Sequence, residues 1–343
     1  MKKIKIIFFI IFPFVVLIGV ISIFLYILTR PEKSVLSFIP EKESITNYNN
    51  YIYNEHLYNN YVDYNGNKFC WLKKGLLSST LTIIDDEGNY KYFSGIGSQF
   101  QLYDNKIFHM KDRTLYSKDI ETGKNKKIAN NVDKFVAFEN LVIFSTKNKW
   151  NNKIGQWENK LYAYNYKTKE KNIIYENVYR FLINDKKLFI VDFDDVLFEL
   201  SINDFSATKL HEIDVKAAPY NVFVQGNLWI FFFGNKFDVL DLEKNELVTI
   251  TVYEGFISDM KFICDKNNMF LSYQAKDNNG SFVFNKKDEN NGLWKINSET
   301  LEKEKISDEI FERLYLFGND LFGVKKNSLY QINIDTYEVK KIS

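Results

Sequence analysis

The stretch Leu115–Lys124 reads LYSKDIETGK and contains the pattern that decides the fold. A bulky apolar residue is followed by an aromatic one, Asp119 lies four residues after the first, and Thr-Gly-Lys completes the turn. Apolar and polar residues alternate in the flanking segments, which is typical of a β-hairpin. Asp and Thr favour the turn because their side chains bond to nearby backbone, and Gly adopts a positive φ without steric cost.

Related stretches recur along the chain, although only the copy at Leu115 carries the complete Asp-x-x-Thr-Gly-Lys. The other copies, of which the first is weaker, begin at Leu81, Leu161, Leu197, Phe237, Leu293 and Leu329. Successive starting residues are separated by 34, 46, 36, 40, 56 and 36 residues. Two further strand-like runs lie between neighbouring copies, and the second is often apolar on both faces, as in 228–233. The repeating unit therefore has four short strands.

Four antiparallel strands repeated at this spacing predict an all-β chain with a β-propeller fold. We assign residues 51–343 to the propeller and expect seven blades of about 42 residues each. Six or eight blades are the alternatives, because the first copy is degenerate. A β-sandwich is the competing all-β fold, and it requires no such repeat. Residues 337–342 read as an outermost strand, so closure would rest on packing between the first and last blades, or on 45–53 as an added edge strand.

The Leu-Tyr-x-x-Asp-x-x-Thr-Gly-Lys form resembles the hairpin repeat of pyrroloquinoline-quinone-type propellers and of their non-enzymatic relatives. The chain also resembles membrane-anchored or secreted bacterial propellers of unknown function that are similar to YWTD-type repeats. This resemblance covers about residues 75–343 and implies an architecture without implying an activity. Lys127-Ile128 stands where quinone-type repeats carry a tryptophan. We therefore expect no quinone and no other cofactor.

The first thirty residues predict a membrane anchor. Residues 6–28 form an uncharged run long enough to cross the hydrocarbon core as a helix, and they follow Lys2, Lys3 and Lys5. The expected organisation is a cytoplasmic tail (1–5), a transmembrane signal anchor (6–29), a linker (30–50) and an extracytoplasmic propeller. A cleaved signal peptide is the alternative, but the run is long for one and lacks an A-x-A site. The first partner is then the lipid bilayer.

The charge distribution argues against a nucleic-acid partner. The 45 basic and 44 acidic residues give a net charge of +1, and four of the basic residues lie within the first thirty positions. The remainder of the chain therefore carries 41 basic and 44 acidic residues, without the basic field that concentrates nucleic acid.

Few residues suggest chemistry. The three histidines are isolated, and no nucleophile elbow or Walker loop occurs. Cys70 and Cys264 fall in strand-like runs of different blades, so we expect two buried thiols rather than a disulfide. Metal binding is not expected. The weak candidate ligands are three residues of one acidic cluster: Asp192, Asp194 and Asp195. A hairpin turn is the simpler interpretation of this cluster.

Two long connections suggest where a ligand would bind. Residues 147–160 contain Trp150 and Trp157, and residues 274–291 contain Phe282 and Phe284. Long loops on a rigid scaffold commonly carry function, and exposed Trp suits a sugar ring or a protein contact. The alternative is that each Trp folds back onto its own blade.

We predict a non-catalytic binding or scaffolding module for a protein or a cell-envelope glycan. The alternative is a propeller enzyme, of the glycan lyase or hydrolase type, with carboxylates in the central channel.

Overall fold

The computed structural model describes residues 62–342 with gaps. The gaps are 65–67, 75–78, 98, 153–155, 185–186, 195, 213–220, 226–227, 234–235, 242–243, 245, 252–255, 265–267, 277–290, 298–299, 301, 318–319 and 327. The side chains of some further strand residues, Trp157, His211 and Cys264 among them, also lie outside the description. The predicted tail, anchor and linker (1–50) fall outside it as well.

Within the described residues the chain contains strands and no helix, which confirms the all-β prediction. The strands form four-stranded antiparallel sheets, numbered here in chain order. Sheet 1 contains β1 (Val62–Tyr64), β2 (Lys68–Lys74), β3 (Ser79–Asp85) and β4 (Tyr90–Ser94). Sheet 2 contains β5 (Gln99–Tyr103), β6 (Lys106–Lys111), β7 (Thr114–Asp119) and β8 (Asn125–Ala129). Sheet 3 contains β9 (Val132–Phe138), β10 (Leu141–Thr146), β13 (Lys160–Asn165) and β14 (Lys171–Glu176).

The remaining four sheets repeat this plan. Sheet 4 contains β15 (Val178–Asn184), β16 (Lys187–Asp192), β17 (Val196–Leu200) and β18 (Ala207–Glu212). Sheet 5 contains β19 (Asn221–Gln225), β20 (Leu228–Phe233), β21 (Lys236–Asp241) and β22 (Glu246–Thr251). Sheet 6 contains β23 (Phe256–Cys264), β24 (Asn268–Lys276), β25 (Gly292–Asn297) and β26 (Lys303–Ser307). Sheet 7 contains β27 (Arg313–Phe317), β28 (Asp320–Lys325), β29 (Ser328–Ile332) and β30 (Val339–Lys341).

The sequence repeat matches the third strand of every sheet. Its starting residues lie in β3, β7, β13, β17, β21, β25 and β29. Those whose side chains are described are almost fully buried: Leu81, Leu115, Leu161, Leu197, Leu293 and Leu329. The repeat is therefore a hairpin of the third and fourth strands, anchored by a buried apolar side chain.

Most repeat turns are held by an Asp or Asn that lies four residues after the starting residue; in sheet 4 this position is Ser201. Asp119 accepts a hydrogen bond from the Thr122 backbone N–H at 2.8 Å, and Asn165 accepts one from the Thr168 N–H at 3.0 Å. The next residue has a positive φ in several copies, including +67° at Gly123 and +70° at Lys169. This left-handed position explains the Gly of the complete motif.

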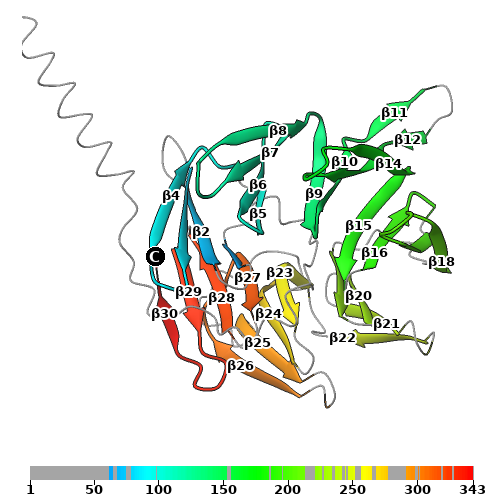
Figure 1. Ribbon diagram of the computed structural model, residues 1–343. Helices are drawn as coiled ribbons and strands as arrows, with labels where there is room; N and C mark the ends of the chain where they lie inside the picture. The colour runs from blue at the N-terminus through cyan, green and yellow to red at the C-terminus, as the bar shows by residue number, and fades with distance from the viewer. Residues whose placement is uncertain are drawn as a thin grey trace, which may run out of the picture.

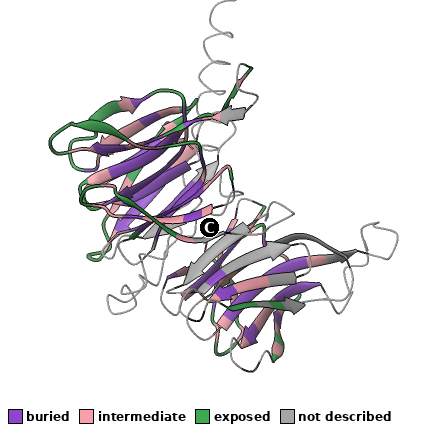
Figure 2. Ribbon diagram, turned by 90° about the vertical axis from the view of Figure 1, so that its right-hand side faces the viewer, coloured by how far each residue is buried: buried purple, intermediate pink, exposed green. Residues whose placement is uncertain are grey.

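Burial decreases from the inner strands of a sheet to its outermost strand. The second strand β10 is buried at four consecutive positions, and β16 and β28 show the same run. Consecutive burial means that both faces are covered, as the sequence predicts. The outermost strand β14 contains exposed and half-buried residues only, and Figure 2 shows exposed residues gathered at turns and edges.

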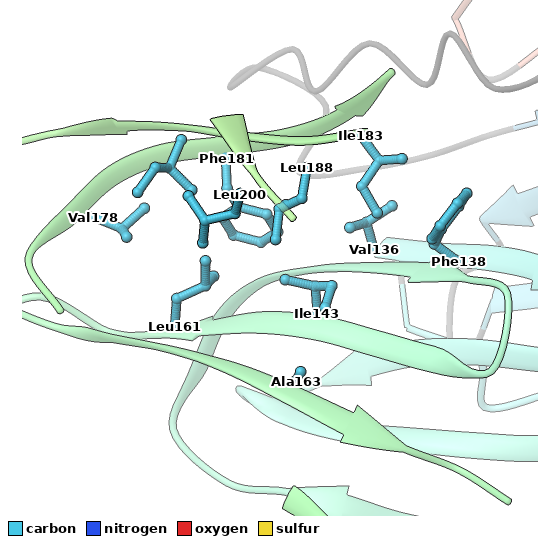
Figure 3. Close-up of a cluster of buried hydrophobic side chains, with 11 residues drawn as sticks. Val136, Phe138, Ile143, Leu161, Ala163, Val178, Phe181, Ile183, Leu188 and Leu200 are labelled. Atoms are coloured by element: carbon cyan, nitrogen blue, oxygen red, sulfur yellow. The ribbon is translucent and has the colours of Figure 1, made fainter. Parts of the chain in front are cut away.

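Apolar side chains join successive sheets. Figure 3 shows the cluster between sheets 3 and 4, where Leu161 and Ile143 from one sheet face Phe181, Leu188 and Leu200 from the next. Comparable clusters join sheets 1 and 2, 2 and 3, 4 and 5, and 6 and 7. For sheets 5 and 6, most side chains at the junction lie outside the description.

The first and last sheets also pack together. Phe69 of β2 contacts Phe322 and Phe317 of sheet 7, with ring centroids 5.2 and 6.1 Å apart. In chain order the sheets follow one another around a common centre, and the red strands of sheet 7 lie beside the blue and cyan strands of sheet 1 (Figure 1). Among the described strands, none is exchanged between these sheets.

Two further expectations concern the cysteines and the last strand. Cys70 is fully buried, as predicted, whereas the Cys264 side chain is outside the description. The chain end expected to form an outermost strand is β30. In the part of the chain that the structure describes, no helix is long and apolar enough to span a bilayer.

Candidate functional site

The connections between strands divide between two ends of each sheet. Because the four strands are antiparallel and consecutive, the connections after the second and fourth strands leave at the same end. We call it the insertion end, because β11 (Lys149–Asn151) and β12 (Gln156–Glu158) are inserted there between β10 and β13. The repeat turns at Asp119 and Asn165 lie at the opposite end.

The first long connection forms a small hairpin rather than an irregular loop. Trp150 of β11 is paired in register with Trp157 of β12, and Asn151 Nδ2 donates to Glu158 Oε1 at 2.5 Å. The Trp150 side chain is 46% exposed, so it does not fold back into the core. Figure 1 shows the hairpin projecting beyond sheet 3. A binding role for Trp150 and Trp157 stays a prediction.

Asn159 attaches the base of this hairpin to the next sheet. Its Nδ2 donates to Val178 O at 2.6 Å and to Asn148 Oδ1 at 2.8 Å, and its Oδ1 accepts from Val178 N–H at 2.8 Å. Asn159 is 7% exposed, and the following N–H, of Lys160, donates to Thr146 Oγ1 at 3.0 Å. Buried hydrogen bonds of this kind are costly to break, so the hairpin has a fixed root.

The other predicted site residues are placed less fully. Phe282 and Phe284 lie in 277–290, outside the described residues. Asp192 Oδ1 accepts from the N–H groups of Asp194 and Val196 at 3.0 and 2.9 Å, which is the turn expected for this cluster. Asp195 is outside the description, and the described residues contain no group of three His, Cys, Asp or Glu side chains suited to a metal.

His109 has a structural environment. It is 2% exposed and its ring stacks on Tyr116. Gly97 N–H points at Nδ1 at 3.4 Å, and Nε2 lies 3.3 Å from Asn125 Oδ1. Burial lowers the pKa of His109 to about 4, so the neutral ring, protonated on Nε2, fits these partners. A Cβ on Gly97 would meet Met110 O at 1.6 Å, so only glycine fits at this point between β4 and β5.

The strand register reveals a set of residues that sequence analysis missed. In sheet 4, Arg180 of the first strand pairs with Val191 of the second, which pairs with the repeat residue Leu197 of the third. The equivalent first-strand residue is polar in every sheet where it is described: Gln99, Lys134, Arg180, Asn221, Lys261 and Arg313. We call Lys134, Arg180, Lys261 and Arg313 the cationic set. Each precedes Phe or Leu at the start of an apolar run, a signal that a comparison of the repeats could have found.

The cationic set lies on the first strands, and each member is level with the second residue of the third strand of its sheet. Lys134 and Arg180 are 7% and 9% exposed, whereas Lys261 and Arg313 are half-buried. Figure 1 shows the strands that carry the set, β9, β15, β23 and β27, on the inner sides of their sheets. The set and the β11–β12 hairpin therefore belong to one end of the molecule.

Comparisons with known proteins agree with this architecture. No protein-family model matches the chain, and no curated protein matches it. Among solved structures, the computationally designed Ika8 protein gives a TM-score of 0.52 and 13% identity over 81% of this chain and 84% of that one. The extracellular domain of the one component system BT4673 from B. thetaiotaomicron gives 0.50 and 10%, over 76% of this chain and 40% of that one. BamB from Moraxella catarrhalis gives 0.49 and 9%, over 79% and 83%. At such identities a likeness shows the fold alone, which is that of a β-propeller. The chain spans less than half of the BT4673 chain.

Proposed function

We propose that the chain is a seven-bladed propeller that acts as a binding or scaffolding module and captures a protein or a cell-envelope glycan at its insertion end. One observation carries this proposal: the β11–β12 hairpin presents a 46% exposed Trp150 from a root fixed by buried hydrogen bonds of Asn159. Rigid presentation lowers the entropy lost on binding, and exposed Trp is enriched where partners dock.

The blade count and closure are part of the proposal. Seven four-stranded sheets and the packing of Phe69 against Phe317 and Phe322 support a ring of seven blades closed without strand exchange. Such a ring is a rigid support, because each sheet is covered by its neighbours on both faces.

Location is also proposed. The uncharged run 6–28 and the lysines before it support a single membrane span with the propeller on the extracytoplasmic side. In this arrangement the bilayer holds the module close to the envelope ligands.

Capture of envelope material by the full chain tests the site. Wild type, Trp150→Ala/Trp157→Ala and Tyr92→Ala would be compared in pull-downs from envelope extracts and in co-sedimentation with purified envelope glycan. Tyr92 is a matched control because it is also 46% exposed but lies on β4, the outermost strand of sheet 1. We expect the double variant to lose most capture and Tyr92→Ala to keep it. Unchanged capture by the double variant, or equal loss by the control, would remove the hairpin from the binding site.

A further inference from the structure

Sheet 6 carries a lysine whose amine is held by aromatic side chains. Lys303 lies on the outermost strand β26 (Figure 1), and its Nζ donates a hydrogen bond to the Tyr273 hydroxyl. The same Nζ lies 4.0 Å from the centroid of the Trp294 ring and 5.0 Å from that of the Tyr273 ring. In the part of the chain that the structure describes, no carboxylate is among the partners of Lys303. Its ammonium form therefore has hydroxyl and ring contacts but no counter-ion there.

The two rings keep much of the water away from this amine. Tyr273 is fully buried, and Trp294 and Lys303 are half-buried. The rings of Tyr273 and Trp294 stack, with centroids 6.3 Å apart and planes at 16°. Burial lowers the pKa of Lys303 to about 8, because removing a cation from water is unfavourable. At that pH about half of the amine is neutral, against less than about 1% for an ordinary lysine, and only the neutral amine is a nucleophile.

A second cation lies on the same face of the strand. Lys303 and Lys305 are two residues apart in β26 and pair with Ile296 and Trp294, so their side chains leave on one side of the sheet. Lys305 Nζ lies 5.6 Å from the centroid of the Trp294 ring and forms an ion pair with Asp308 Oδ1 at 2.6 Å. An ammonium group has three N–H donors, so Lys305 has the capacity for a further anionic partner. A negative group on Lys303 would replace repulsion between the two amines by attraction.

From this arrangement we infer that Lys303 is a modification site at which the amine adds carbon dioxide reversibly and becomes a carbamate. The lone pair of Nζ forms a bond to the carbon of carbon dioxide, and one C=O electron pair moves onto oxygen. Nζ then releases a proton to solvent. No oxidant, reductant or leaving group takes part, and the side chain changes from a cation into an anion.

The surroundings favour carbon dioxide over other electrophiles that react with amines. Carbon dioxide is small and uncharged, which suits an amine flanked by the rings of Tyr273 and Trp294. The carbamate oxygens would accept hydrogen bonds from the Tyr273 hydroxyl and from the Lys305 ammonium group, and charge-assisted bonds of this kind are strong. A Schiff base formed with an aldehyde stays cationic when protonated, so it gains nothing from Lys305. The inference is independent of the proposed capture site, which lies on sheet 3.

Chemical trapping in the full chain tests this inference. The protein is incubated at the pKa of Lys303 with isotopically labelled bicarbonate as the source of carbon dioxide. Carbamates are then fixed by alkylation with triethyloxonium, and peptide mapping by mass spectrometry locates the label. Lys126 is the matched comparison, because its Nζ donates to the Tyr164 hydroxyl at 3.2 Å and lies 6.0 Å from that ring, yet Lys126 is exposed. We expect at least about tenfold more label on Lys303 than on Lys126.

The comparison within the wild-type protein decides the inference without any substitution. Absence of label on Lys303, or labelling no greater than that of Lys126, overturns it. An aldehyde probe, glyceraldehyde trapped with cyanoborohydride, covers the rival chemistry. Selective trapping of glyceraldehyde at Lys303 without a carbamate also overturns the inference and assigns a Schiff base in its place.

Variants test the support that the neighbours give to the carbamate. Lys305→Gln removes the second cation, and Tyr273→Phe keeps the buried ring but loses the hydroxyl, so each should lower the label on Lys303 several-fold. Lys126→Gln removes a cation from the comparable tyrosine contact at β8 and should leave that label unchanged. If Lys305→Gln and Tyr273→Phe both label as wild type does, the proposed stabilisation of the anion is wrong.

Discussion

Gln101 and Ala137 join the first strands of two successive sheets through a pair of buried hydrogen bonds. Gln101 Nε2 donates to Ala137 O at 3.0 Å, and Ala137 N–H donates to Gln101 Oε1 at 2.7 Å. The side-chain amide takes the place of a neighbouring strand between β5 and β9. Asn159 makes the same pair of bonds with Val178 between sheets 3 and 4. Sheets that cannot share a backbone ladder are thus linked by amides.

Replacing Gln101 by Leu should therefore destabilise the fold. Both backbone groups of Ala137 lose their partners in a buried setting, and the expected cost is about 2–4 kcal/mol of unfolding free energy. Urea denaturation measures this change. Gln331→Leu, at a half-buried position of β29, is the control and should change stability by less than about 1 kcal/mol. Equal stability of the two variants would show that the amide bridge is dispensable.

The repeat turns predict a stabilising substitution. Lys169 has a φ of +70° at the position that Gly123 occupies in the complete motif, with a φ of +67°. Lys169→Gly removes the strain that the Cβ causes at this positive φ. Glycine also raises the entropy of the unfolded chain, which offsets part of this relief, so we expect a net gain of about 0.5–1 kcal/mol in unfolding free energy.

The reciprocal change is the matched control for this turn. A Cβ on Gly123 would meet no atom within 4 Å, so Gly123→Ala tests the backbone conformation alone and should cost about 1 kcal/mol. Chemical denaturation of both variants measures the effect. A loss of stability in Lys169→Gly would refute the explanation of the motif's Gly.

Because His109 is buried, we expect the protein to lose stability in mild acid. Its pKa is about 4 in the folded protein and close to 6.5 when unfolded, so both states are neutral above that range. As pH falls from about 6.5 to 4, the unfolded chain takes up the proton first, and roughly 3 kcal/mol of stability is lost.

Urea denaturation at several pH values measures this step, and His109→Gln should flatten it. Hydrogen bonds lower the pKa of Asp119 below its usual 3.8, with the bond from Thr122 N–H the largest cause, so this carboxylate acts at lower pH. A profile that is unchanged in His109→Gln would place the acid sensitivity elsewhere.

Lys303 should be unusually reactive toward amine reagents. Its Nζ donates to the Tyr273 hydroxyl and lies 4.0 Å from the centroid of the Trp294 ring. Burial lowers the pKa of Lys303 to about 8, so about half of its amine is neutral at that pH. The neutral amine is the nucleophile in acylation, and acetylation near pH 8 should label Lys303 early.

Lys305 provides the comparison within the same strand. Its Nζ also faces Trp294, at 5.6 Å, but forms an ion pair with Asp308 Oδ1 at 2.6 Å. Peptide mapping by mass spectrometry gives the two labelling rates, and we expect Lys303 to react several-fold faster. Faster labelling of Lys305 would show that access, not protonation, governs this site.

The hairpins were predictable because their signals are local. Alternation fixes which residues of a strand are buried, and an Asp or Asn with Thr fixes the turn, so Leu115, Leu161 and the other starting residues all lie in third strands. Burial on both faces of the second strands follows from their apolar runs, as β10 shows. These inferences need no information about distant residues.

The candidate site was predicted only in part, because it depends on long-range arrangement. A two-Trp loop could be located, but its folding into β11–β12 depends on the pairing of Trp150 with Trp157. Lys134 and Arg180 are distant in sequence and single lysines are common in this chain, so neither stands out alone. Their equivalence requires either an alignment of all the repeats or the strand register, which connects each to a repeat residue.

Packing of Phe69 and Trp71 against sheet 7 has a consequence for biosynthesis. Sheet 1 is synthesised first, whereas sheet 7, which carries Phe317 and Phe322, is the last of the seven sheets to leave the ribosome. Until then the partner-facing surface of sheet 1 stays exposed, and exposed apolar surface on an incomplete fold promotes aggregation. Chaperone dependence should therefore centre on the interval before sheet 7 is synthesised.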